Sequence, residues 1–232
     1  HTRRRRQRQM CIRDRYSMDG TETNISDYVK LAKKYNALTY LDEVHAVGLY
    51  GKGGRGVAYK NNVSDQIDII NGTLAKGFGQ IGGYIVANQT TIDFIRSFAP
   101  GFIFTTSMMP SIAAAASKSI EIVENLDEER EDIFNKAKYF RQKLKLLDIP
   151  FIDSNSHIIP IFTYSTKKAK LFSKLLLQQY NSYIQPIFYP TVPEGSARLR
   201  ITVTPKHSIQ DIDNSLAALK SCLLYTSDAA DD

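Results

Sequence analysis

The 232-residue chain is 43% hydrophobic and 23% charged, which is enough apolar material for one or two folded cores. No apolar run approaches the roughly 18 residues of a transmembrane helix, so we expect no membrane partner. The net charge of +6 would suit a nucleic-acid-binding protein, but residues 1–15 contribute +6 and residues 222–232 contribute −3, which leaves +3 on residues 16–221. So little excess charge on the body predicts no nucleic-acid partner.

The two ends of the chain are interpreted as adapter-like sequence that does not belong to the folded protein. One DNA segment can encode residues 4–15 on one strand and residues 222–232 on the other, which is typical of a sequencing adapter. This interpretation removes three alternatives, namely a phosphate-binding arginine arm, a transit peptide and a disulfide between Cys11 and Cys222. We therefore expect residues 16–221 to be an internal part of a longer enzyme.

The first half of this body alternates helix-like and strand-like segments. Helices are expected from Ser26 onwards, over 90–99 and over 111–126 after Pro110; strands are expected at 37–42, 67–70 and 82–87, with a strand-like segment at 102–106. This alternation predicts an α/β fold with a mostly parallel sheet, and we assign residues 16–127 to part of a large domain.

The second half of the body has a different pattern of expected helices and strands. A long, charged amphipathic helix over 128–147 leads into strands at 157–163, 183–187 and 197–203, with helices at 167–180 and 209–219. This order predicts a smaller α+β domain, and we assign it residues 128–221.

The most informative side chain is Lys76, in the run Gly72-Thr73-Leu74-Ala75-Lys76-Gly77-Phe78-Gly79. A lysine between glycines that follows a strand has room for the bulky adduct of Schiff-base chemistry. Most lysines in such loops are simply exposed. The hydroxyl of Thr73, three residues earlier, could bind a phosphate, and this makes the Schiff-base interpretation more specific.

Asp42 ends the strand-like run before Glu43, and His45 follows three residues after Asp42. In pyridoxal 5'-phosphate, a carboxylate beside the pyridine nitrogen favours the protonated ring, which takes up the electrons of a carbanion. An imidazole can bind the phenolic oxygen of the same cofactor, although a structural histidine is the alternative. Together with Lys76, these residues predict an enzyme that uses pyridoxal 5'-phosphate, and no metal site is predicted.

Three further loops carry glycines or polar groups. Residues 51–56 lack a Gly-Lys-Ser/Thr ending and are not expected to open a helix, so we interpret them as a flexible turn. The hydroxyls of residues 105–107 could bind phosphate or cap the next helix, and both alternatives stay open. Residues 189–196 are expected to form a lid before a strand on which Arg198 and Arg200 share a face, either to bind a carboxylate or as surface arginines.

These motifs resemble the α-oxoamine synthases, a family of fold-type I pyridoxal-phosphate enzymes. The matching segments are 16–20, 40–50, 67–84, 96–107, 156–161 and 183–205. The resemblance implies the C-terminal part of a large cofactor-binding domain followed by a small α+β domain. Residues 101–107 and 183–193 look specific to the branch that condenses glycine with succinyl-CoA to 5-aminolevulinate, CoA and CO2, the first step of haem and tetrapyrrole biosynthesis.

The resemblance also implies a role for each matching residue. Lys76 would be the Schiff-base lysine and proton-transfer group, and the other cofactor contacts would be Ser17, Asp42, His45 and Thr73. In a homodimer, Thr105 and Thr106 would reach the phosphate of the neighbouring subunit's cofactor. Arg200 would hold the glycine carboxylate, and Thr191 would belong to the lid over succinyl-CoA.

Two alternatives remain beside this hypothesis: a sibling synthase that uses another donor such as acetyl-CoA, and a non-catalytic binding module with a basic arm. The resemblance implies a bacterial cytoplasmic or a mitochondrial matrix enzyme. It also implies that the aromatic residue over the cofactor ring and most CoA contacts lie in a missing front half. We therefore expect the chain by itself to be inactive.

Overall fold

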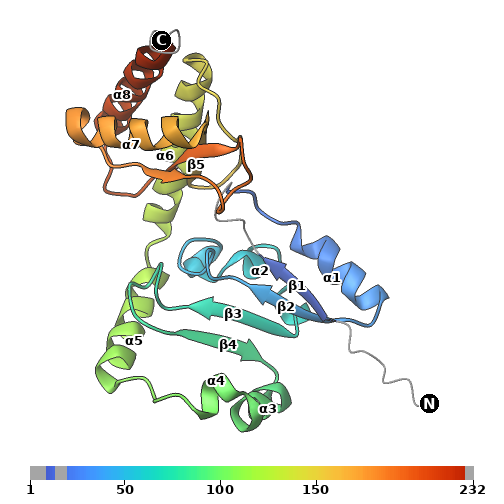
Figure 1. Cartoon of the computed structure of the whole chain (residues 1–232). Helices are drawn as coiled ribbons and strands as arrows, with labels where there is room; N and C mark the ends of the chain where they lie inside the picture. The colour runs from blue at the N-terminus through green and yellow to red at the C-terminus, as the bar shows by residue number, and fades with distance from the viewer. Residues whose placement is uncertain (1–8, 14–19, 228–232) are drawn as a thin grey trace. The chain divides into compact units, whose positions relative to one another are not determined.

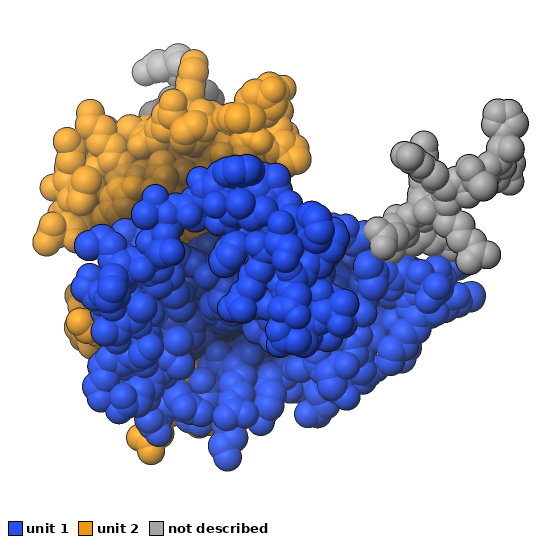
Figure 2. All heavy atoms as spheres, turned by 90° about the horizontal axis from the view of Figure 1, so that it is seen from below, with its two compact units in different colours: residues 1–15, 23–127 blue, residues 16–22, 128–232 orange. Residues whose placement is uncertain are grey.

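The computed structural model describes residues 9–13 and 20–227, and these form two compact units (Figures 1 and 2). Unit 1 contains residues 9–13 and 23–127, and unit 2 contains residues 20–22 and 128–227. The sequence assigns residues 20–22 to the first domain. They join unit 2 because the backbone of Gly20 lies against Ser156 and the carbonyl of Ile158.

Unit 1 is built on a four-stranded sheet in the order β1-β2-β3-β4 (Figure 1). The strands are β1 (Gln9–Arg13), β2 (Leu38–Asp42), β3 (Ile69–Thr73) and β4 (Gly83–Ala87). The first three run parallel and β4 pairs antiparallel with β3, which confirms the mostly parallel sheet. β3 ends three residues later than the expected strand.

Strand β1 lies within the end that the sequence excludes from the fold. In the structure it pairs with β2 over its whole length, from Gln9 opposite Leu38 to Arg13 opposite Asp42, and Ile12 is buried. Met10 and Ile12 are partly and fully buried while Gln9, Cys11 and Arg13 are exposed, which is the alternation of a strand that buries one face. The foreign origin of residues 1–15 stays an interpretation.

Five helices complete unit 1: α1 (Ile25–Lys34), α2 (Val57–Lys60), α3 (Gln89–Phe98), α4 (Pro100–Ile103) and α5 (Pro110–Glu124). Two short 3₁₀ turns, η1 (Lys52–Gly54) and η2 (Ser64–Gln66), lie in the connections. α1 packs on β1 and β2 and buries Ile25, Val29 and Ala32. Asn24 stands at its N-cap, so Ser26 lies within the first turn rather than before it.

The strand-like segment expected at residues 102–106 is wrong. Pro100 begins α4, and the amides of Ile103 and Phe104 donate to the carbonyls of Ala99 and Pro100, four residues earlier. Aromatic and β-branched residues favour strands only where a neighbouring strand can pair with them. Here the fixed φ of proline at the first helical position favours a helical turn instead.

Unit 2 consists of a three-stranded antiparallel sheet and three helices (Figure 1). Its elements are α6 (Asp127–Leu146), β5 (Ile158–Tyr164), α7 (Thr166–Tyr180), β6 (Gln185–Ile187), β7 (Ala197–Thr202) and α8 (Ile209–Ser227), with β7 at the centre of the sheet. Phe140 of α6, Phe172 of α7 and Leu219 of α8 pack with Ile161 and Leu199 of the sheet in one core. The α+β prediction is therefore confirmed.

Helix α8 continues to Ser227, beyond the expected end at residue 219, and thereby enters the second excluded segment. Cys222 is buried in the core of unit 2, and both Cys11 and Cys222 are free thiols. None of the helices in the described part of the chain is long and apolar enough to span a membrane.

Candidate active site

The neighbouring parallel strands β2 and β3 bring four of the predicted site residues to one edge of the sheet. Asp42 is the last residue of β2 and Thr73 is the last residue of β3, and Asp42 pairs with Asn71. His45 and Lys76 each follow their strand by three residues. Polar side chains at the carboxyl ends of parallel strands are where open α/β sheets bind ligands.

The Asp42 carboxylate is held by an ion pair and a backbone hydrogen bond. Its side chain is 26% exposed, and Oδ2 lies 3.4 Å from Nε of Arg13 on β1. Oδ1 accepts the amide of Val44 at 3.1 Å. His45 is half-buried in the turn that follows, where the carbonyl of Glu43 accepts the amide of Val47 at 3.1 Å. The carboxylate and the imidazole thus belong to one fixed turn.

Thr73 and Lys76 belong to a tight loop between β3 and β4. The Thr73 hydroxyl donates to the carbonyl of Gly82 at 3.2 Å and accepts the amide of Ala75 at 3.1 Å. The amide of Gln80 donates to the carbonyl of Leu74 at 2.7 Å. Lys76 is exposed at the outer part of this loop.

Apolar contacts attach the Lys76 loop to the rest of unit 1. Leu74 and Phe78, on either side of Lys76, pack with Val47 of the His45 turn and with Ala116 of α5. Ser119 of α5 also donates its hydroxyl to the carbonyl of Phe78 at 2.7 Å. These contacts place the lysine loop and the Asp42–His45 turn on a common support.

One buried group was not anticipated as part of the site. Glu43 is only 2% exposed, and its Oε1 accepts the amide of Ala58 at 2.6 Å. Burial raises the pKa of Glu43 to about 7, although the amides of Ala58 and Val57 lower it in part. The available signal was its position beside Asp42 at the strand end, where successive side chains point to opposite faces.

The glycine-rich loop at residues 51–56 is more ordered than the flexible turn that we expect from the sequence. It contains η1, and it does open a helix, because Gly56 is the N-cap of α2. The amides at the start of that four-residue helix are taken by Glu43. The same carboxylate that anchors the loop therefore occupies the place of an anion.

The hydroxyl cluster at residues 105–107 does not cap the following helix. Met109 is the N-cap of α5, and no side chain donates or accepts a capping hydrogen bond there. Thr105 and Thr106 are exposed. Of the two alternatives, the capping role is wrong. Ser17 lies outside the described residues.

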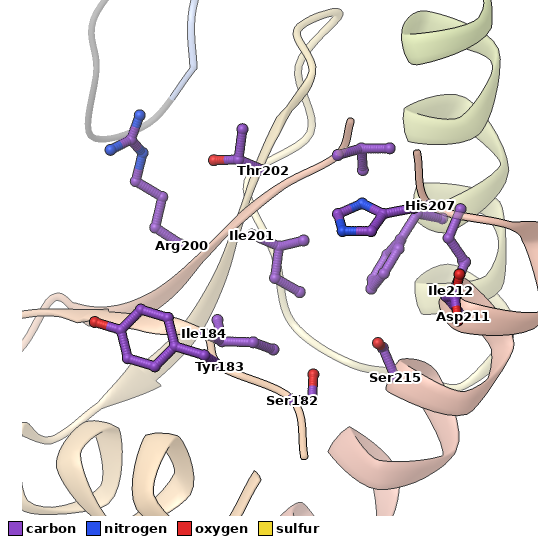
Figure 3. Close-up of a pocket in the computed structure, with 12 residues that line it drawn as sticks. Ser182, Tyr183, Ile184, Arg200, Ile201, Thr202, His207, Asp211, Ile212 and Ser215 are labelled. Atoms are coloured by element: carbon purple, nitrogen blue, oxygen red, sulfur yellow. The ribbon is translucent and has the colours of Figure 1, made fainter. Parts of the chain in front are cut away.

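Two predicted substrate-binding residues lie in unit 2. Thr191 is exposed, and its amide donates to the carbonyl of Phe188 at 3.0 Å. Arg200 is half-buried on β7 and lines a cavity of about 110 Å³, yet its guanidinium points away from His207 and Asp211, which line the other side (Figure 3).

Arg198 shares the β7 face with Arg200 but has a different environment. It is buried, its Nε donates to the carbonyl of Ser196 at 3.0 Å, and its guanidinium lies 5.3 Å from the ring centroid of Phe162. These contacts make Arg198 a packing residue of the small sheet. Within the described ranges, no group of three or more His, Cys, Asp or Glu side chains is placed to hold a metal ion.

Sequence comparison relates the chain to known proteins. The profile of the family Aminotransferase class I and II matches residues 3–219. The 5-aminolevulinate synthase of Rickettsia felis is 50% identical over 207 residues, which are 88% of this chain and 49% of that protein. The 5-aminolevulinate synthase of Bradyrhizobium diazoefficiens is 48% identical, over 88% of this chain and 50% of that protein. The chain thus spans about half the length of the curated relatives it matches.

Solved structures share the fold. The serine palmitoyltransferase of Sphingomonas wittichii is 26% identical with a TM-score of 0.87, over 94% of this chain and 55% of that one. A structure described as SPT with a PLP internal aldimine is 28% identical with a TM-score of 0.85, over 91% of this chain and 54% of that one. The 8-amino-7-oxononanoate synthase of Francisella tularensis, at 23% identity, has a TM-score of 0.82 over 95% of this chain and 64% of that one. These likenesses confirm the predicted fold-type I class.

Proposed function

The chain belongs to the class I and II aminotransferase family, and on that premise we propose that it serves the condensation of glycine with succinyl-CoA. The products of this acyl transfer are 5-aminolevulinate, CoA and CO2. Relatives at 45–50% identity that carry the name 5-aminolevulinate synthase support this substrate pair over acetyl-CoA. A non-catalytic binding module is not favoured, because those relatives are named as synthases.

The single observation that carries the proposal is the set of groups at the ends of β2 and β3. A carboxylate (Asp42), an imidazole (His45), a hydroxyl (Thr73) and an amine (Lys76) follow two adjacent parallel strands. This donor set fits pyridoxal 5'-phosphate, since each group matches one feature of that molecule: ring nitrogen, phenolic oxygen, phosphate and aldehyde. When bound, the cofactor supplies an electron sink for negative charge at the substrate α-carbon.

The residues of this chain would then share the work as follows. Asp42 keeps the ring nitrogen protonated by its opposite charge, and His45 orients the ring through the phenolic oxygen. The Lys76 amine holds the cofactor and afterwards takes a proton from the glycine α-carbon and returns one to the product. General acid–base groups of this kind contribute about 10²- to 10⁴-fold to a rate.

We assign substrate contacts to unit 2. The Arg200 guanidinium binds the glycine carboxylate through a two-pronged, charge-assisted contact. Thr191 belongs to the segment that covers succinyl-CoA. Ser17 would add a cofactor contact. The resemblance implies the bacterial cytoplasm or the mitochondrial matrix as the place of the reaction.

We further propose a homodimer in which Thr105 and Thr106 reach the phosphate of the partner's cofactor. Large apolar side chains near these threonines in the sequence are exposed on unit 1: Phe94, Phe98, Phe102, Phe104 and Met109. Phe104 alone is 86% exposed. Exposed large apolar side chains in such number on one unit support a surface that another chain covers.

The proposal can be tested in a chimera. Residues 20–221 of this chain replace the matching half of the Rickettsia felis enzyme, and product formation is measured with glycine and either succinyl-CoA or acetyl-CoA. We expect succinyl-CoA to be preferred, and Lys76→Ala to lower kcat by at least about 10²-fold. A preference for acetyl-CoA would identify the sibling synthase, and an unaffected Lys76→Ala chimera would refute the catalytic assignment. The 232-residue chain alone is expected to form no product.

A further inference from the structure

Glu43 is a buried carboxylate that the proposed reaction does not use. Through its backbone carbonyl it accepts the amides of Ala46 and Val47, at 2.9 and 3.1 Å. Through its side chain it accepts the amides of Ala58, at 2.6 Å, and Val57. One residue therefore ties together both ends of the segment 44–58, which contains His45 and the glycine-rich loop.

Within that segment, the backbone of the glycine-rich loop packs directly against the turn that contains His45. The amide of Gly48 donates to the carbonyl of Gly54 at 2.7 Å. A Cβ added to Gly54 would lie 2.9 Å from the carbonyl carbon of Gly48, closer than real Cβ atoms approach a backbone. The two backbones are thus in direct contact, with no room for a side chain between them.

The next contact reaches the lysine loop. Gly77 follows Lys76 directly, and a Cβ on Gly77 would lie 2.8 Å from the carbonyl oxygen of Val47 and 3.2 Å from Cα of Gly48. Leu74 and Phe78 pack with Val47 beside this contact. The path from the Glu43 carboxylate to Lys76 is therefore continuous: the loop 51–58, Gly48, and Gly77.

We propose that Glu43 is a positioning residue for Lys76, acting through the close backbone contact between Gly48 and Gly77. The proposal rests on the role of Lys76 in the proposed function. The carboxylate anchors the glycine-rich loop, the loop packs against the His45 turn, and the turn fixes the position of the lysine loop relative to Asp42. Displacements of about 1 Å in a reacting group can cost about 10²-fold in rate, so such support matters for the site.

The experiment has one readout that needs no cofactor and one that uses pyridoxal 5'-phosphate. Hydrogen–deuterium exchange of the peptide 74–80 in the 232-residue chain reports how firmly the lysine loop is held. Titration with pyridoxal 5'-phosphate reports the affinity of the site. In Glu43→Ala, which removes the oxygen atoms that accept the amides of Ala58 and Val57, we expect at least fivefold faster exchange in this peptide and at least tenfold weaker binding.

Asp68→Ala, which likewise removes a hydrogen-bonded carboxylate, is the matched control. Asp68 is a part-buried carboxylate that accepts the amide and the hydroxyl of Thr39, at 2.7 and 2.8 Å, and it precedes β3 whereas Lys76 follows it. This change should alter exchange of the peptide 74–80 by less than twofold. Gly77→Ala tests the path at its other end, and Gly101→Ala, where a Cβ meets nothing within 4 Å, is its control.

The outcomes are distinct. Faster exchange in Glu43→Ala and Gly77→Ala but not in the controls supports the proposal. Unchanged exchange in a folded Glu43→Ala chain overturns it, and so does unchanged cofactor affinity in a chain whose loop has loosened. If Glu43→Ala does not fold, Gly77→Ala decides by the same criteria. A wild-type chain that binds no pyridoxal 5'-phosphate would count against the proposed function, while the exchange result would still decide the coupling.

Discussion

Replacing Glu43 by glutamine should change how the stability of the fold depends on pH. Burial raises the pKa of Glu43 from 4.5 to about 7 in the folded protein, so the neutral acid is the form that folding favours. Each pKa unit corresponds to about 1.4 kcal/mol, which makes the full effect about 3 kcal/mol. This contribution is present below pH 4.5 and is lost as the pH rises through 7. Glutamine has no proton to lose and lacks this dependence.

The assay is urea unfolding of the wild-type chain and of Glu43→Gln between pH 4 and 8.5. The free energy of unfolding of the wild type should fall relative to the variant by about 3 kcal/mol over this range. Tyr84 is a titratable group that interacts with Glu43, and burial, followed by the charge of Glu43, raises the pKa of its phenol above the ordinary value of 10.0. Tyr84→Phe should therefore retain the wild-type pH dependence below pH 8.

A difference between wild type and Glu43→Gln that stays within about 1 kcal/mol from pH 4 to 8.5 would contradict the argument. It would mean that the amides of Val57 and Ala58 compensate the buried charge fully. If the wild type instead gains stability relative to Glu43→Gln as the pH rises, the folded protein favours the ionised form of Glu43.

Four further changes have defined expectations. Arg13→Ala removes the ion pair with Asp42, whose side chains are 51% (Arg13) and 26% (Asp42) exposed, so the free energy of unfolding should change by less than about 1 kcal/mol. A larger loss would mean that the pairing of β1 with β2 depends on this ion pair. Arg200→Lys should raise the KM for glycine in the chimera at least about tenfold, because an ammonium cannot form the two-pronged contact; an unchanged KM would move the carboxylate site elsewhere. Phe104→Asp should lower the dimer fraction in sedimentation equilibrium with a stability change near zero, since the side chain is exposed; an unaltered dimer would exclude this face. Phe140→Ala should cost about 3–5 kcal/mol in urea unfolding, because the ring is buried in the core of unit 2, and a cost below about 1 kcal/mol would contradict that packing.

Local patterns were sufficient for much of the fold. The apolar run 37–42 predicts a strand that ends at Asp42, as β2 does, whereas β3 ends at Thr73, three residues beyond the expected strand at 67–70. The α/β class of unit 1 and most of its longer helices and strands followed from the same periodicities, whereas β1, α2 and α4 did not. The strand prediction at residues 102–106 was wrong because its aromatic and β-branched residues resemble a strand, whereas Pro100 and the i to i−4 hydrogen bonds form a helical turn that ends at Ile103.

The sequence by itself determined which chemical groups follow each strand, since a carboxylate, an imidazole and an amine three residues beyond a strand end are local features. Only the tertiary structure decided what holds them. The burial of Glu43 and the contact between Gly48 and Gly77 join residues that are 15 and 29 positions apart in the chain. Close packing of distant backbone segments depends on the whole core and leaves no periodic signal in the sequence. The sequence of residues 51–56 therefore predicts a flexible turn, although Glu43 anchors this loop in the structure.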